Sequence, residues 1–285
     1  MTVSTPAGAV AEAKDHVENV VREASPLVRA LARLGFVAKG VVYIIVGALA
    51  LGAPFSRGGS TTDERGALRT ILHQPFGRTM LVVAGVGLAG YCVWRMIQAF
   101  FDPEHVRHDA KGFGRRAARF VSGVTYGALA FTAWQMVFRG EQGGSGRTQD
   151  WTATLMSKPA GPWLVGIAGV VIIGVGGWQL YRAWTSKLGD KLMLDRWGAR
   201  MRDWIITFGR VGYAARGVIF CMMGGFLLVA ADRNNPQEAK GAAEAMRHVE
   251  GLSYGAWLLA AIAAGLIAYG LFQLVEARYR RIDVS

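Results

Sequence analysis

The sequence has little charge and few of the residues that build catalytic or metal sites. Only 18% of its 285 residues are charged, and its two cysteines, Cys92 and Cys221, lie in separate apolar segments. Two such cysteines provide neither a disulfide framework nor a zinc site. The HExxH zinc motif, the phosphate-binding loop and the nucleophile elbow are missing, as are paired carboxylates within the apolar segments. These absences predict a protein that is not an enzyme, with no catalytic residue, no cofactor and no metal.

Two local patterns resemble ligand sites but have simpler interpretations. GVGLAG at 85–90 fits the dinucleotide-binding pattern, which has meaning only between a strand and a helix. Here it lies inside an apolar helical segment, so we interpret it as a helix-packing sequence. His105 and His108 lie close together in PEHVRHDA, which we interpret as a solvated charged linker rather than a metal site.

The residues that are abundant point to a membrane. Hydrophobic residues make up 52% of the chain, and it contains 38 glycines. The apolar residues cluster in blocks of about 20, the length that crosses roughly 30 Å of hydrocarbon. A backbone in lipid must satisfy its own hydrogen bonds, so each block is expected to form a helix. Six blocks qualify, at approximately residues 34–53, 79–100, 118–138, 162–184, 210–231 and 254–275.

The net charge of +12 is interpreted as a topology signal. If the N-terminus is cytoplasmic, 19 Lys and Arg residues lie in inner segments and 10 in outer segments. The positive-inside rule therefore places both termini in the cytoplasm, in the cytoplasmic membrane, and no nucleic-acid partner is expected. Residues 1–25 do not form a signal peptide, because they are charged and lack a short apolar core. Their valines at helical spacing predict an amphipathic helix on the cytoplasmic surface.

One apolar stretch is repeated along the chain. RLGFVAKGVVYIIVG at 33–47 returns as RVGYAARGVIFCMMG at 210–224, with a weaker copy, RAARFVSGVTYGALA, at 116–130. The partner segments also correspond, as GYCVWRMIQAF at 90, GVGGWQLYRAW at 174 and AYGLFQLVEAR at 268. The segments that join each pair contain cap-forming residues and end at Pro or Gly, which predicts a short helix on the outer surface.

These repeats predict an all-α polytopic membrane protein of six transmembrane helices. The helices are expected as three tandem hairpins, and the repeats run parallel, about an axis along the membrane normal. The expected divisions are the N-terminal helix at 1–25 and repeats at 26–102, 103–186 and 187–285.

The pattern R-x-G-x-x-A-[KR]-G-V-[VI]-[YF], three hairpins and a closing [WF]-[RQ]-x-x-[QRE]-A resembles a known family. It is similar to the bacterial integral membrane proteins grouped as domain of unknown function 1206. The middle copy departs from the pattern, with Ala118 for the first glycine and Ser122 for the basic residue. The resemblance implies the three-hairpin architecture, and the family carries no agreed activity.

Polar residues in the inner third of the expected helices form the candidate site. A charge within the bilayer is costly, so Lys39 either extends to the headgroups or faces a polar ring inside the bundle. The ring has one carboxylate, Glu276, which we expect to pair with Lys39 or Arg216 across a repeat boundary. Such a cationic layer can bind lipid phosphates or a small anion. Its members are Lys39, Arg95, Gln98, Arg119, Ser122, Gln179, Arg182, Arg216, Gln273 and Glu276.

Glycines at equivalent positions of the repeats are expected to pack helices closely, because a missing Cβ lets backbones approach. They are Gly35, Gly40, Gly47, Gly123, Gly127, Gly212, Gly217 and Gly224.

The expected function is that of a non-catalytic structural or partner-binding membrane protein. The alternative is a channel or transporter for a small, anionic solute, based on the repeats and the cationic layer. A membrane-embedded enzyme has the least support, since no acid, base or metal set is visible. The expected partners are the bilayer, with anionic headgroups on the cytoplasmic side, and a membrane-protein partner or a second copy of the chain.

Overall fold

The computed structural model describes residues 25–55, 61–100, 110–140, 147–185, 188 and 198–280. In this part of the chain the regular elements are helices, and no strand is found. Residues 1–24 of the expected surface helix and the linker with His105 and His108 lie outside the described residues.

The described chain contains six long helices, two in each repeat. A short helix lies between the two long helices of each repeat. The short helices are α3 (Glu64–Leu72), α6 (Arg147–Met156) and α9 (Ala242–Glu250), as the cap-forming residues predict, and 3-10 turns lie at η1 (Ala53–Phe55) and η2 (Pro236–Glu238). The long helices α2, α5 and α8 begin before the expected apolar blocks, because a helix in water needs backbone hydrogen bonds but no apolar surface. The long helices are α2 (Ser25–Gly52), α4 (Gly77–Phe100), α5 (Ala110–Arg139), α7 (Gly161–Trp184), α8 (Ala199–Asp232) and α10 (Gly255–Tyr279).

Five helices of the described chain are long and apolar enough to cross a membrane. They comprise Ala32–Gly52 within α2, then α4, α7, α8 and α10. α5 has 30 residues, but Ser122, Thr125 and Thr132 lie in its apolar part. The structure therefore supports a multi-pass membrane protein, whereas five spans qualify rather than the expected six.

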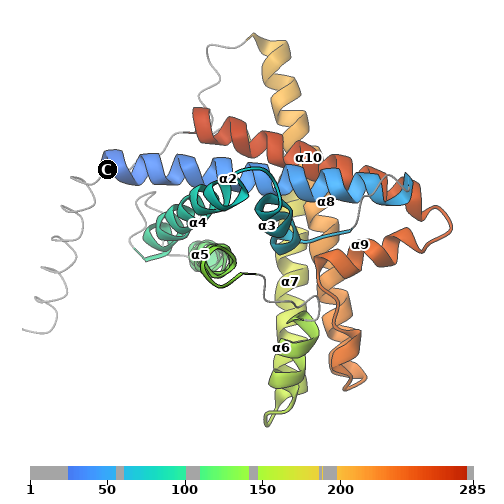
Figure 1. Cartoon of the computed structure of the whole chain (residues 1–285). Helices are drawn as coiled ribbons and strands as arrows, with labels where there is room; N and C mark the ends of the chain where they lie inside the picture. The colour runs from blue at the N-terminus through green and yellow to red at the C-terminus, as the bar shows by residue number, and fades with distance from the viewer. Residues whose placement is uncertain are drawn as a thin grey trace, which may run out of the picture.

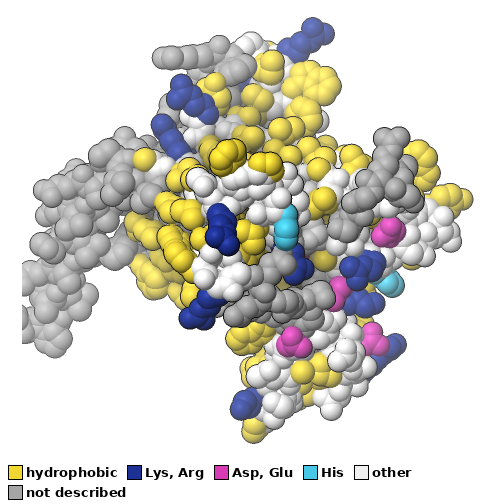
Figure 2. Space-filling model, in the orientation of Figure 1, with side chains coloured by type: hydrophobic (Ala, Val, Ile, Leu, Met, Phe, Trp, Pro, Cys, Tyr) yellow, Lys and Arg dark blue, Asp and Glu magenta, His cyan; other side chains and the backbone are white. Residues whose placement is uncertain are grey.

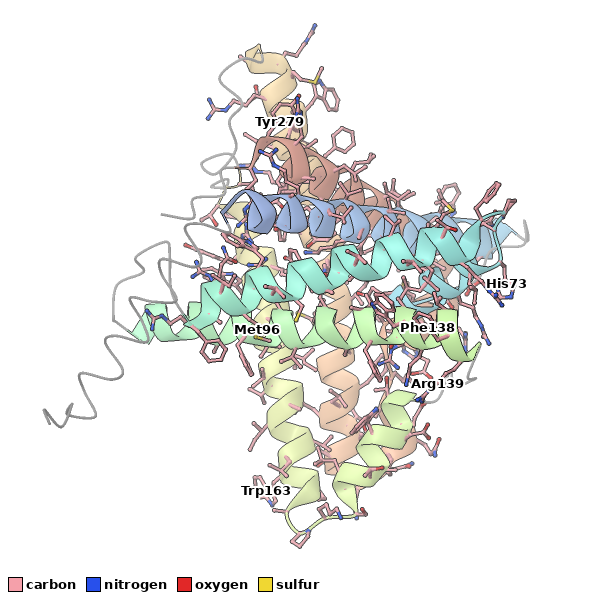
Figure 3. All side chains as sticks on the ribbon, turned by 60° about the vertical axis from the view of Figure 1, so that its left-hand side comes forward. His73, Met96, Phe138, Arg139, Trp163 and Tyr279 are labelled. Atoms are coloured by element: carbon pink, nitrogen blue, oxygen red, sulfur yellow. The ribbon has the colours of Figure 1, made fainter. Side chains whose placement is uncertain are left out.

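The long helices form antiparallel pairs across the repeat boundaries. α10 packs on α2, α4 on α5, and α7 on α8. Figures 1 and 3 show these pairs pointing in three different directions, with α7 and α8 upright in both views and α2 and α10 lying across Figure 1. The pairs therefore cross one another instead of running side by side.

Small residues at equivalent positions allow the close approach within these pairs. A Cβ on Gly270 would lie 2.6 Å from the carbonyl oxygen of Gly40, and a Cβ on Gly176 would lie 2.8 Å from that of Gly217. In the third pair, a Cβ on Gly127 would lie 3.0 Å from the sulfur of Cys92, which stands where the other repeats have glycine. Figure 3 labels Met96 in this third pair, between α4 and α5, and a Cβ on Gly123 would lie 2.8 Å from its methyl carbon. Gly47 and Gly224 make the corresponding approaches to Ala263 and Gly169.

Within the repeats, only the first and third hairpins are closely packed. A Cβ on Gly35 would lie 2.5 Å from the Tyr91 Cβ, and a Cβ on Gly212 would lie 2.5 Å from the Tyr269 Cα. The middle repeat has Ala118 and Val175 at the equivalent positions. In the described chain α5 and α7 do not pack along one another, so the expected middle hairpin is not formed.

Candidate functional site

A buried lysine lies where the helix pairs cross. Lys39 of α2 is 4% exposed. Its Nζ lies 5.2 Å from the ring centroids of Tyr91 and Tyr126 and 5.1 Å from that of Tyr269. An ammonium over aromatic faces is attracted by the negative face of each ring. Lys39 therefore faces the interior, and the interpretation that it extends to the lipid headgroups is wrong.

A buried arginine from the third repeat shares this environment. Arg216 of α8 stands opposite Lys39 in the repeat alignment, and its Cζ lies 5.1 Å from the ring centroids of Tyr43 and Tyr269. Its Nη1 donates a hydrogen bond of 2.9 Å to the Tyr269 hydroxyl. The Tyr43 hydroxyl in turn donates to Glu64 Oε1 at 2.6 Å, which connects the interior to α3.

A second arginine holds one of the rings around Lys39. Arg95 Nε and Nη2 donate to the Tyr91 hydroxyl at 2.9 and 2.5 Å, and its Nη1 donates to Gln98 Oε1 at 3.1 Å. Arg119 Nη1 donates to the Gln98 carbonyl at 3.1 Å, tying α5 to α4. We define the cation–tyrosine cluster as Lys39, Arg95 and Arg216 with Tyr43, Tyr91, Tyr126 and Tyr269.

The one carboxylate of the expected ring has a different partner. Glu276 accepts hydrogen bonds from Arg280 Nη1 at 2.8 Å and from Gln273 Nε2 at 2.6 Å. The expected pairing of Glu276 with Lys39 or Arg216 is therefore wrong, because Arg280 lies one turn away on the same face of α10. α10 does close onto α2, and the Arg280 guanidinium lies 5.1 Å from the Phe36 ring centroid.

The middle repeat contributes less to this interior. Arg182 of α7 lies over the Tyr213 ring, with Cζ 4.4 Å from its centroid. Gln179 is buried, and its Oε1 has no hydrogen-bond partner. Ser122, which replaces the basic residue of the other copies, is partly exposed. The cluster thus takes its cations from the first and third repeats, and Tyr126 alone from the second.

The cluster is rich in hydrogen-bond donors and cations. Among the described residues, Lys39, Arg95, Arg216 and Arg280 face two carboxylates, Glu64 and Glu276. No carboxylate of the described chain lies within 4 Å of Lys39 Nζ or of the Arg216 guanidinium. No group of three metal-ligating side chains occurs in the described part either. Such a donor set binds anions rather than cations.

Sequence reasoning missed the tyrosines, because an uncharged aromatic residue does not stand out in an apolar block. The repeat alignment carried a signal for them. Tyr43 and Tyr126 occupy one equivalent position, one helical turn after Lys39 and Ser122, and Tyr91 and Tyr269 occupy another, one turn before Arg95 and Gln273. Polar aromatic residues that recur one turn from basic residues point to cation–ring contacts.

Comparison with known proteins is consistent with the repeats. Residues 34–102, 117–186 and 211–280 each match the family model described as Domain of Unknown Function (DUF1206), which confirms three tandem copies. The chain is also 29% identical over 267 residues to "Uncharacterized protein YxxB" of Bacillus subtilis (strain 168), which covers 94% of this chain and 96% of that protein. No solved structure matches this chain.

Proposed function

The chain belongs to the family described as Domain of Unknown Function (DUF1206), and since that description states no activity, we propose from its geometry a non-catalytic structural or partner-binding membrane protein. The observation that carries this proposal is the repeated glycine contact. Backbones meet at equivalent positions between α2 and α10 and between α7 and α8. Interiors packed through small residues stabilise a fixed arrangement of helices in lipid.

We propose that the protein lies in the cytoplasmic membrane with both termini in the cytoplasm. The outward faces of the helices support a membrane location, because they carry large apolar side chains such as Phe131, Val170 and Trp178, which are 63%, 61% and 49% exposed. The choice of membrane and of orientation rests on the distribution of Lys and Arg along the sequence. Figure 2 shows such side chains over much of the visible face. An apolar surface of this kind is typical of lipid contact.

The crossed pairs are compatible with a bilayer. A membrane normal that lies between the three pair directions tilts every helix, so that each still passes from one side to the other. The helices have 24 to 34 residues, more than the roughly 20 that an upright span needs. Extra length of this kind is accommodated by tilt.

The experiment is a flux assay on the purified full chain in liposomes. Wild type, Lys39→Ala and Arg216→Ala are compared with protein-free liposomes for chloride, phosphate and potassium movement. If the protein has only a structural or partner-binding function, we expect no flux above the protein-free level in any sample. Flux in wild type that is lost in both variants would overturn it.

That opposite result would establish the second candidate, a channel or transporter for a small anion. The buried cations favour it, since Lys39 and Arg216 lie in the interior of apolar helices. Ionisable residues within membrane helices commonly mark ion pathways.

We propose as partners anionic lipid headgroups at the cytoplasmic ends of the helices, and a membrane protein or a second copy against the lipid-facing sides. Arg200 and Arg202, at the exposed beginning of α8, are the type of residue that binds lipid phosphates. Mass spectrometry of the protein released from nanodiscs of mixed lipids measures this preference and the number of copies together. Equal retention of zwitterionic and anionic lipid would contradict the lipid part.

A further inference from the structure

The cation–tyrosine cluster carries positive charge that its own residues do not balance. Glu276 is paired with Arg280 at 2.8 Å, and Glu64 reaches the cluster only through the Tyr43 hydroxyl. Lys39 Nζ and Arg216 Cζ each lie 5.1 Å from the centroid of the Tyr269 ring, so these two cations share one aromatic neighbour. Arginine does not lose its proton in proteins, so the charge at Arg216 is permanent. Buried charge without a counter-charge is costly.

Hydrogen-bonding groups beside these cations are also left without partners. The buried Arg216 Nε has no hydrogen-bond partner, and the buried Tyr126 hydroxyl, which lies beside that of Tyr43, makes no hydrogen bond of good geometry. The ring of Tyr126 is one of the three that surround Lys39 Nζ. A buried donor without an acceptor loses its interaction with water and gains nothing in return. A hydroxyl and a guanidinium N–H therefore lack an acceptor in the region where aromatic rings surround the Lys39 ammonium.

We propose that the cluster binds one small inorganic anion, of about the size of a halide, held by Lys39, Tyr126 and Arg216. The surrounding rings set its size, because Tyr91 and Tyr269 are 0% and 1% exposed and leave no access for a large ligand. A lipid headgroup does not reach Lys39, because Lys39 lies about 10 Å along the helix from Ala32, the residue at which the apolar span of α2 begins. The anion balances the charge whether or not it ever crosses the membrane.

The test is anion-dependent thermal unfolding of the full chain, purified in an uncharged detergent without lipid. Sodium chloride replaces sodium gluconate at constant ionic strength, so that screening is unchanged and a small halide is compared with a large organic anion. An anion that binds the folded state alone raises Tm with concentration and then saturates. We expect chloride to raise Tm, and radiolabelled chloride to bind at one per chain.

Two variants and a control locate the site. Lys39→Met removes the charge, and Tyr126→Phe removes one hydroxyl while the ring stays over Lys39. Each is expected to weaken apparent chloride affinity at least tenfold, whereas Lys158→Met, at an exposed lysine, leaves it unchanged. If Lys39→Met fails to fold, Tyr126→Phe decides the question. Equal Tm in chloride and gluconate, or wild-type affinity in Tyr126→Phe, would overturn the proposal.

This result is separate from the flux assay. Chloride binding without flux supports both the anion site and the structural function. Flux together with binding removes the structural function and leaves the site in place, and absence of binding removes the site alone.

Discussion

Glu276 and Arg280 form a buried ion pair whose partners are 7% and 11% exposed. Arg233 and Glu238 form the contrasting pair, at 3.0 Å, with side chains 63% and 30% exposed. The two pairs have similar geometry and different surroundings. Removing one partner of a buried pair leaves an uncompensated charge, whereas an exposed charge is solvated by water.

We therefore predict that Glu276→Ala lowers the free energy of unfolding by about 3–5 kcal/mol. Glu238→Ala is the matched control and is expected to cost less than about 1 kcal/mol. Reversible unfolding of both variants in mixed detergent micelles measures the difference. Similar losses in the two variants would show that the Glu276 side chain is hydrated.

At the scale of elements, the first of the three short helices begins at a partly buried acidic cap. Asp63 Oδ1 accepts a hydrogen bond of 2.9 Å from the Gly66 N–H at the beginning of α3. Burial raises the pKa of the Asp63 carboxyl above its usual value, and the Gly66 hydrogen bond offsets part of this shift. A carboxyl with a raised pKa in the folded state contributes most stability when protonated. That contribution is complete below the unfolded pKa of about 3.9 and is lost as pH rises through the folded value.

Asp63→Asn keeps a capping oxygen and removes the ionisation. We predict that it has a higher Tm than wild type at pH 7, and that the gap narrows as pH falls towards about 4. Asp63→Ala lacks the cap and is expected to be less stable than Asp63→Asn by about 1 kcal/mol at every pH. Thermal unfolding across this pH range measures both effects, and a gap that does not change with pH would refute the assignment.

The contact between α2 and α10 depends on a missing side chain. A Cβ on Gly270 would lie 2.6 Å from the Gly40 carbonyl oxygen, a backbone atom that cannot rotate away. Gly174 of α7 has no atom within 4 Å of its Cβ position. The same substitution therefore has opposite consequences at the two sites.

Gly270→Ala is predicted to destabilise the protein by about 1–3 kcal/mol through overpacking. Gly174→Ala is predicted to be neutral, or stabilising by up to about 1 kcal/mol, because alanine is the better helix former. Unfolding free energies measured on both proteins check this, and a loss at Gly174 equal to that at Gly270 would mean that helix propensity does not explain the contrast.

At the scale of the whole molecule, the long helices form one continuous series of contacts. In this series α5 packs on α4, α4 on α2, α2 on α10, α10 on α8 and α8 on α7. The two ends of this series, α5 and α7, both belong to the middle repeat. These helices have Ala118 and Val175 at the positions equivalent to Gly35 and Tyr91. The short helices α6 and α9 are linked to each other, because Gln149 Nε2 donates a hydrogen bond to Glu244 Oε1 at 3.0 Å. In the topology that we propose, an even number of crossings places both termini on the side opposite these short helices.

Cysteine labelling tests this topology. In a Cys92→Ala, Cys221→Ala background, we predict that Ser157→Cys and Ser253→Cys react with a membrane-impermeant maleimide in intact cells. Both serines are exposed in turns that follow the short helices. Ser285→Cys is expected to react only after the membrane is permeabilised. Labelling of Ser285→Cys in intact cells would reverse the proposed orientation.

The sequence by itself predicted the helices, the short linking helices and the three copies, because each depends on local composition, capping residues and self-similarity. It also selected Lys39, Arg95 and Arg216 as interior candidates, since charge in an apolar block is visible in one dimension. Only the tertiary structure decided what faces them. Tyr91, Tyr126 and Tyr269 come from three different helices, and their rings meet Lys39 only because the pairs cross near mid-length.

The same limit explains the two main corrections. Glu276 was expected to reach another repeat, but Arg280 on its own helix lies closer, and side-chain direction decides between the two. The middle hairpin was expected from the correspondence of the repeats, yet α5 and α7 do not pack along one another, and Ala118 and Val175 stand where the closely packed repeats have a glycine and a tyrosine. Chain order and periodicity determine which helices exist, whereas the volume at each crossing point decides which of them touch.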